Sequence, residues 1–218
     1  MATHNKRYLL KLISEGEHVH QDFKYQISDA KKIARSISAF ANNSGGRLLV
    51  GVKDNGNIAG VSSDEEMYMI QQAADMYCRP PQTLSYEIVN AEGRSVLIAT
   101  IAEAEKKPVK APDEKGSWKA YFRVADENVL ASAMHVRIMK GETSADDDSA
   151  PMITYGENEQ ALLDYLNGHG GITLDGYAAL AHISRFKAEE SVVNLCEMGI
   201  IELQYHNGTC LITATDSE

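Results

Sequence analysis

The sequence lacks any long apolar run, and it contains only three cysteines among its 218 residues. No stretch approaches the roughly 20 apolar residues that a membrane-spanning helix needs, so no membrane association is expected. The N-terminal segment also lacks the apolar core and the cleavage site of a secretory signal. The cysteines are odd in number and widely separated, which argues against a disulfide framework or a zinc site. These absences predict a cytoplasmic protein.

Basic residues are scarce in the last third of the chain. Residues 1–140 hold 19 basic against 17 acidic residues, whereas residues 152–218 hold two basic against ten acidic ones. Between them, residues 141–151 are polar, carry four acidic residues and contain no large apolar side chain. This pattern predicts a first domain over 1–140, an acidic linker over 141–151 and a second domain over 152–218. A polyanion is expected to meet the first domain, despite the net charge of −10.

The first domain is organised around residues 38–60, SAFANNSGGRLLVGVKDNGNIAG. Asn42, Asn43, Gly45 and Gly46 break a helix, because glycine and asparagine tolerate turn conformations that other residues avoid. An apolar strand follows, and the run DNGN at 54–57 predicts a tight hairpin turn. The favoured interpretation of the glycine turn is a helix cap that leads into the sheet. The alternative is a turn whose backbone amides face a phosphate.

The remaining pattern of the first domain alternates between helices and strands. Helices are predicted at 3–14, at 30–43 after an N-cap at Ser28 or Asp29, at 63–79 and at 127–141. Strands are predicted at 19–26, 48–52, 83–90, 95–102 and 116–125. Residues 103–116 are expected to form a surface loop. This order predicts an α+β domain with a mixed sheet.

The second domain reads as three helices followed by a hairpin. The helices are predicted at 159–171, 173–183 and 184–199, and the hairpin at 200–213 turns at Asn207-Gly208. This order is the winged-helix pattern of the helix-turn-helix class. Arg185 and Lys187 are the only basic residues of the domain, and the wing has none. Two roles stay open: direct contact with DNA, or dimerisation and partner contact.

Several segments of the first domain carry a family resemblance. The strings EGEHVHQDFK, ISAFANNSGG, RLLVGVKDNGNIAGV and YFRVADEN are similar to those of the Schlafen AlbA_2 family, also called divergent AAA_4. The resemblance covers residues 15–140 and implies nucleic-acid binding. With a winged-helix tail, it implies a bacterial DNA-binding transcriptional regulator.

The same family includes metal-dependent RNases that use three acids. Carried onto this chain, the acids are Glu17, Asp22 in place of a family glutamate, and Asp54. Such a set would hold Mg²⁺ or Mn²⁺, which prefer hard oxygen ligands. The alternative is that Glu17 and Asp22 are polar strand positions and that Asp54 only shapes a turn. Enzyme activity is therefore not the leading expectation, and no G-x-x-x-x-G-K-[ST] loop supports an ATPase.

The leading hypothesis is a homodimeric nucleic-acid-binding regulator, with DNA rather than RNA as its partner. A metal-dependent nuclease and a protein-interaction module are the alternatives. Phosphates are contacted by basic side chains and by backbone amides. The candidate contacts are Lys24, Lys31, Lys32, Arg35, Asn42, Asn43, Gly45, Gly46, Arg47, Lys53, Arg185 and Lys187.

Overall fold

A computed structural model describes residues 2–141, 156–206 and 208–215. The chain divides into two compact units between Ala131 and Ser132. All of the predicted linker except Gly141 lies outside the described residues. The predicted boundary at residue 140 stays a prediction, but the structure groups the helix before it with the second unit.

The first unit is built on a mixed four-stranded sheet with the strand order β1-β2-β4-β3. Its strands are β1 (Gln21–Lys24), β2 (Gly46–Val50), β3 (Leu84–Ala91) and β4 (Arg94–Ile101). β1 and β2 are parallel, and the other pairs are antiparallel. The parallel pair is possible because helix α2 (Ala30–Asn42) connects the two strands. The α+β class and the mixed sheet predicted from the sequence are confirmed.

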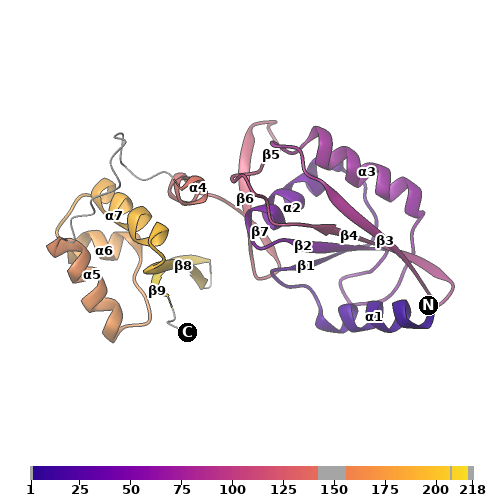
Figure 1. Ribbon diagram of the computed structural model, residues 1–218, viewed down its shortest axis with the longest axis horizontal. Helices are drawn as coiled ribbons and strands as arrows, with labels where there is room; N and C mark the ends of the chain where they lie inside the picture. The colour runs from indigo at the N-terminus through magenta and orange to yellow at the C-terminus, as the bar shows by residue number, and fades with distance from the viewer. Residues whose placement is uncertain (1, 142–155, 207, 216–218) are drawn as a thin grey trace. The chain divides into compact units, whose positions relative to one another are not determined.

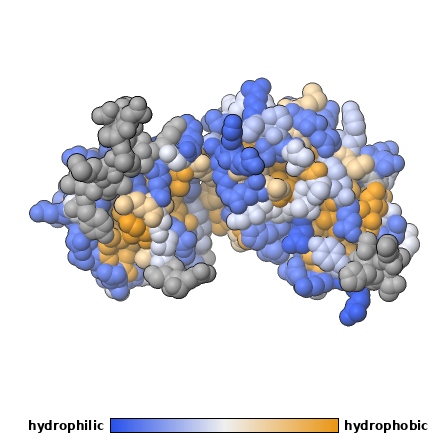
Figure 2. Space-filling model, in the orientation of Figure 1, coloured by the Kyte–Doolittle hydropathy of each residue, from blue (hydrophilic) through white to orange (hydrophobic). Residues whose placement is uncertain are grey.

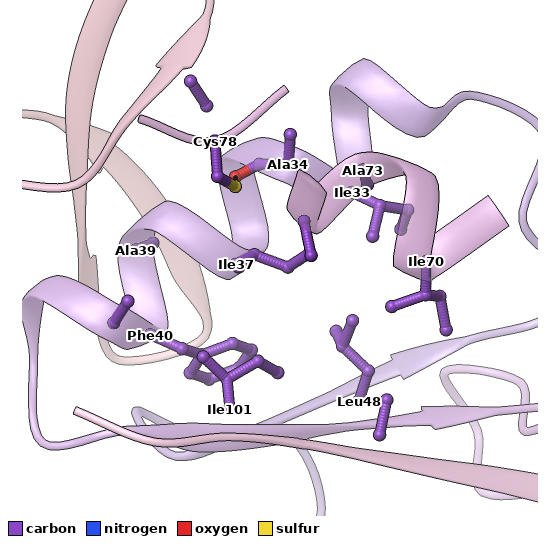
Figure 3. Packing of buried hydrophobic residues seen from close by; sticks show 14 of the residues in the cluster. Ile33, Ala34, Ile37, Ala39, Phe40, Leu48, Ile70, Ala73, Cys78 and Ile101 are labelled. Carbon is purple, nitrogen blue, oxygen red and sulfur yellow. Dashed lines mark hydrogen bonds between the residues drawn. The ribbon is translucent and has the colours of Figure 1, made fainter. Parts of the chain in front are cut away.

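Helices cover both faces of this sheet (Figure 1). Successive strand residues point to opposite faces. Leu48 and Val50 accordingly pack with α2 and α3 (Ser63–Met76), whereas Leu49 packs with α1 (Ala2–Glu15). Figure 3 shows Phe40 of α2 packed beside Ile101, with Leu48 below Ile70 of α3. The sheet is therefore buried on both faces, and the segments that follow its strands are the parts that can form a surface site.

A second, three-stranded sheet corrects two predictions, because Lys110–Pro112, within the surface loop predicted at 103–116, is a strand, and so is part of a predicted helix. It consists of β5 (Lys110–Pro112), β6 (Trp118–Val124) and β7 (Glu127–Leu130), in that order. The helix predicted over 127–141 is wrong in its first part, because β7 pairs antiparallel with β6. Ala125, with φ of 50°, allows the tight turn between them. Pairing with β6 therefore makes the segment Glu127–Leu130 a strand, and the helix α4 spans only Ala133–Lys140.

The second unit has its own apolar core. It contains α4, α5 (Glu157–Gly168), α6 (Leu174–Leu180), α7 (Arg185–Glu197), β8 (Ile201–His206) and β9 (Thr209–Ala214). Leu162, Tyr177 and Val192 are fully buried in this core, and Met134 of α4 packs into it. Three helices and then an antiparallel hairpin follow in the predicted order. Asn207 of the predicted hairpin turn lies outside the described residues.

The surfaces of both units are mixed in polarity. On the face shown in Figure 2, hydrophilic residues cover much of each unit and hydrophobic residues lie between them. Among the helices that the structure describes, none combines the length and the apolar character that a membrane crossing needs.

Candidate functional site

A polar groove of about 390 Å³ lies where β1 leads into α2. The chain leaves β1 at Lys24, passes Gln26 and Ser28, and enters α2 at its N-cap Asp29. The Asp29 carboxylate accepts hydrogen bonds from the backbone N–H groups of Lys31 and Lys32, as predicted for the helix start. β6 and β7 supply the opposite wall. The residues lining the groove are Asp22, Lys24, Gln26, Ile27, Ser28, Asp29, Lys32, Ile33, Arg35, Ser36, Tyr121, Arg123, Asp126 and Asn128.

Arg123 of β6 anchors this groove, and its side chain is fully buried. Its guanidinium donates to the side-chain oxygen of Asn128 at 3.1 Å and to the backbone oxygen of His18 at 3.1 Å, and it lies over the Phe40 ring. Its Nε is buried and has no hydrogen-bond partner within the described part of the chain. Burial lowers the pKa of Arg123, and the nearby Asp22 opposes this effect. A buried, incompletely satisfied cation is costly, which marks this place as unusual.

Sequence reasoning missed Arg123. The available signal was an arginine inside the apolar strand AYFRVA, because arginine is rarely buried without a partner. Asn128 is close in the chain, but the partners His18 and Asp22 lie about a hundred residues earlier, so the pattern alone does not reveal them.

Two of the three predicted acids lie together. Asp22 is 4% exposed, and its Oδ2 lies 2.7 Å from Lys24 Nζ and 3.8 Å from Arg123 Nη1. Glu17 Oε1 accepts a hydrogen bond of 2.8 Å from the backbone N–H of Phe23. Burial raises the pKa of Glu17, and a hydrogen bond with Asp22 raises it further. Glu17 therefore holds a proton more readily than an ordinary glutamate does.

Asp54, the third predicted acid, is exposed in the turn after β2. Among the residues that the structure describes, no three His, Cys, Asp or Glu side chains are grouped so that they could hold a metal ion. The structure thus brings Glu17 and Asp22 together but does not add Asp54. Because Asp22 already faces two cations, this donor set does not fit the Mg²⁺ or Mn²⁺ site that the resemblance implied.

The predicted basic contacts are distributed over several hollows. Lys24, Lys32 and Arg35 line the groove around Arg123. Arg47 lines another hollow and donates to the Tyr8 hydroxyl at 3.3 Å. Two further lysines lie beside exposed or partly exposed tyrosine rings: Lys31 beside Tyr77 and Lys53 beside Tyr25.

The side chains of Asn42 and Asn43 form hydrogen bonds inside the protein. Asn42 is 6% exposed, and its amide donates to the backbone oxygens of Val109 and Tyr121 and accepts from the N–H of Val109. Asn43 exchanges two hydrogen bonds with the backbone of Arg123. Both asparagines therefore fix β6, and Arg123 with it, against the end of α2.

The predicted glycine turn is a site of close packing. Gly45 has φ of 77°, and a Cβ there would lie 2.8 Å from the backbone oxygen of Ile101. A Cβ at Gly46 would lie 2.2 Å from the Phe40 ring. The N–H groups of Gly45 and Arg47 donate to backbone oxygens of Phe40 and His20, so these amides are occupied. The geometry matches the interpretation of this turn as a helix end.

The basic residues of the second unit are few and partly paired. Arg185 forms ion pairs with Asp175 and, at 3.5 Å, with Glu189. Lys187 is exposed in the first turn of α7. Beside them Phe186 is 64% exposed, which is unusual for a phenylalanine.

Comparison with known proteins assigns the first unit to a family. The sequence model of the Schlafen AlbA_2 family matches residues 17–132, more than half of the chain. The chain belongs to the Schlafen AlbA_2 family. A search of curated proteins gives no match.

Two solved structures resemble this AlbA_2 protein. The DIP2311 protein from Corynebacterium diphtheriae is 18% identical with a TM-score of 0.44, and the match covers 96% of this chain. The chain spans 38% of the length of that protein. The N-terminal domain of a RecG-related protein from Nitrosomonas europaea is 20% identical with a TM-score of 0.42, and the match covers 59% of this chain and 95% of that domain.

Proposed function

We propose that this AlbA_2 protein is a DNA-binding transcriptional regulator whose first unit contacts the phosphate backbone through the groove at Arg123. The observation that carries this proposal is that Lys24, Lys32 and Arg35 line one groove with the buried guanidinium. Lysine and arginine are the usual side-chain donors to phosphate oxygens. Membership of the AlbA_2 family agrees with a nucleic-acid-related role.

Three carboxylates also line this groove, and two of them are already engaged. Asp22 pairs with Lys24, and Asp29 caps α2. The third, Asp126, is exposed in the turn before β7. The surplus of positive charge is small, so binding is expected to depend on a few defined phosphate contacts, each of which adds to its salt dependence.

Lys32 allows a direct test, because it is exposed and lines the groove. In Lys32→Gln, one phosphate contact is lost, so the slope of log affinity against log salt is expected to become about one unit shallower. The measurement is fluorescence anisotropy of labelled DNA between about 50 and 200 mM salt. Lys106→Gln is the matched control, because Lys106 is an equally exposed lysine elsewhere. Equal slopes for the two variants would contradict the proposal.

For the second unit, we propose a winged-helix domain that mediates homodimerisation. Support comes from the pairing of Arg185 with two acids and from the exposed Phe186 at the start of α7. An arginine that is already paired with two carboxylates is poorly suited to phosphate contact, whereas an exposed aromatic side chain suits a protein interface.

A further inference from the structure

Tyr25 lies between two residues of the groove but lines a different hollow. Lys24 and Gln26 line the groove at Arg123, whereas Tyr25 lines a neighbouring hollow of about 500 Å³. The consecutive residues Lys24, Tyr25 and Gln26 thus belong to two different hollows, the groove and the hollow lined by Tyr25. Because Tyr25 follows Lys24 directly in the chain, its ring lies one residue from a side chain that lines the groove.

The Tyr25 ring is accessible and held in a basic setting. Tyr25 is 53% exposed, and Lys53 Nζ lies 5.5 Å from the centroid of its ring. Arg94 borders the same hollow, and its guanidinium donates to the backbone oxygen of Ile58. Gly60 leaves room for this arrangement, because a Cβ there would lie 2.8 Å from Arg94 Cβ. An exposed aromatic face with nearby cations is the arrangement that stacks nucleobases.

Other aromatic side chains near the sheet are less available. Tyr121 is 8% exposed, and the Trp118 ring is covered by the Arg79 guanidinium at 3.8 Å. Tyr68 is 68% exposed on α3, but it does not line the groove or the hollow beside Tyr25. Tyr25 is thus an exposed ring that directly follows Lys24, one of the groove-lining cations.

We propose that Tyr25 and Lys53 form a stacking subsite for one unpaired base, so that the protein prefers single-stranded over double-stranded nucleic acid. This inference rests on the proposed nucleic-acid binding. In a duplex, both faces of each internal base are already stacked on neighbours, and exposing one face costs free energy. Glu92 also borders the hollow, and its carboxylate disfavours a phosphate there while tolerating an uncharged base.

The test compares Tyr25→Ala, Tyr25→Phe and the matched control Tyr68→Ala in the full-length chain. Affinity is measured by fluorescence anisotropy for a single-stranded oligonucleotide and for the duplex of the same sequence. Tyr25→Ala is expected to lose about fivefold or more of the single-strand affinity and to leave duplex affinity within about twofold. Tyr25→Phe retains the ring and is expected to bind as the wild type does. Quenching of 2-aminopurine fluorescence in the strand reports stacking directly.

The outcomes separate this inference from the function on which it rests. Wild-type protein that binds both nucleic acids, with Tyr25→Ala unchanged, would overturn the stacking subsite alone. Equal losses for single strand and duplex in Tyr25→Ala would overturn it too, because they indicate a general contact. If the wild type binds neither nucleic acid, the proposed function fails and the subsite fails with it. Thermal unfolding of each variant confirms that it is folded.

Discussion

Arg123 and the Glu17–Asp22 pair determine the electrostatics of the groove. Asp22 is buried, and Lys24 and Arg123 both approach its Oδ2. These two cations offset the free-energy cost of burying a carboxylate. Within the described part of the chain Glu17 forms no such ion pair, and its carboxyl depends on the N–H of Phe23 and on a hydrogen bond with Asp22. The two carboxyls therefore have different roles, although they are five residues apart in one segment.

The raised pKa of Glu17 leads to a pH-dependent stability. The folded-state pKa lies above the ordinary value of 4.5, so this carboxyl favours folding while protonated, and its contribution is lost as the pH rises through the folded-state pKa. Glu17→Gln is neutral at every pH and can still accept from Phe23. The free energy of unfolding of Glu17→Gln, relative to the wild type, is therefore expected to increase from about pH 4 to about pH 7.

Urea denaturation at the two pH values provides this measurement. Glu15→Gln serves as the control, because Glu15 is an exposed glutamate two residues away. A relative stability of Glu17→Gln that stays level or falls with rising pH would show that Glu17 is not destabilised by ionisation in the folded state.

At the scale of elements, the end of α2 aligns the groove with the sheet. Asn42 and Asn43 bind the backbone of β6 and of the segment before it, and Gly45 lets the chain reverse directly beneath Ile101. The end of α2 thus packs closely against neighbouring strands. The glycine turn is required by this close packing, and the N–H groups of Gly45 and Arg47 donate to backbone oxygens within the protein.

Gly45→Ala is expected to destabilise the protein more than Gly116→Ala does. Both residues have positive φ, of 77° and 82°, so both variants lose about 1 kcal/mol to backbone strain. Only at Gly45 does the added Cβ collide with backbone, the oxygen of Ile101 at 2.8 Å, which adds about 1–3 kcal/mol. Urea denaturation of both variants measures the difference, and equal losses would mean that the turn relaxes at little cost.

At the scale of the whole molecule, the chain consists of two units with separate apolar cores. The first unit carries 17 of the 21 basic residues, and the described part of the second has four basic against eight acidic residues. This separation agrees with the proposed nucleic-acid contact by the first unit and with the proposed self-association through the second.

Phe186→Ser is expected to weaken self-association of the full-length protein. Burying a phenylalanine contributes about 1.5–3 kcal/mol, so its loss should raise the dimer dissociation constant by about tenfold or more. Sedimentation equilibrium of the wild type and the variant measures this constant. Tyr68→Ser, at an exposed aromatic residue of the first unit, is the control. A wild type that stays monomeric at high concentration would contradict the proposed dimer.

Local patterns in the sequence were sufficient for much of the fold and for the family. The N-cap at Asp29, the break at Gly45-Gly46, the apolar strand at Leu48–Val50 and the charge contrast between the two parts all depend on neighbouring residues. Such patterns are readable because backbone conformation and strand or helix periodicity act over a few residues. The same string of residues 38–60 carried the family resemblance.

Only the tertiary structure decided which residues meet. β7 is a strand because β6 is beside it, and Asn42 is structural because Val109 and Tyr121 offer it backbone groups. Arg123 joins Asp22 across 101 positions of the chain, whereas Asp54 remains apart from Glu17 and Asp22. These outcomes depend on long-range packing and burial. The type of a side chain sets which groups it can bind, but the fold determines whether it binds them inside the protein or is exposed at the surface.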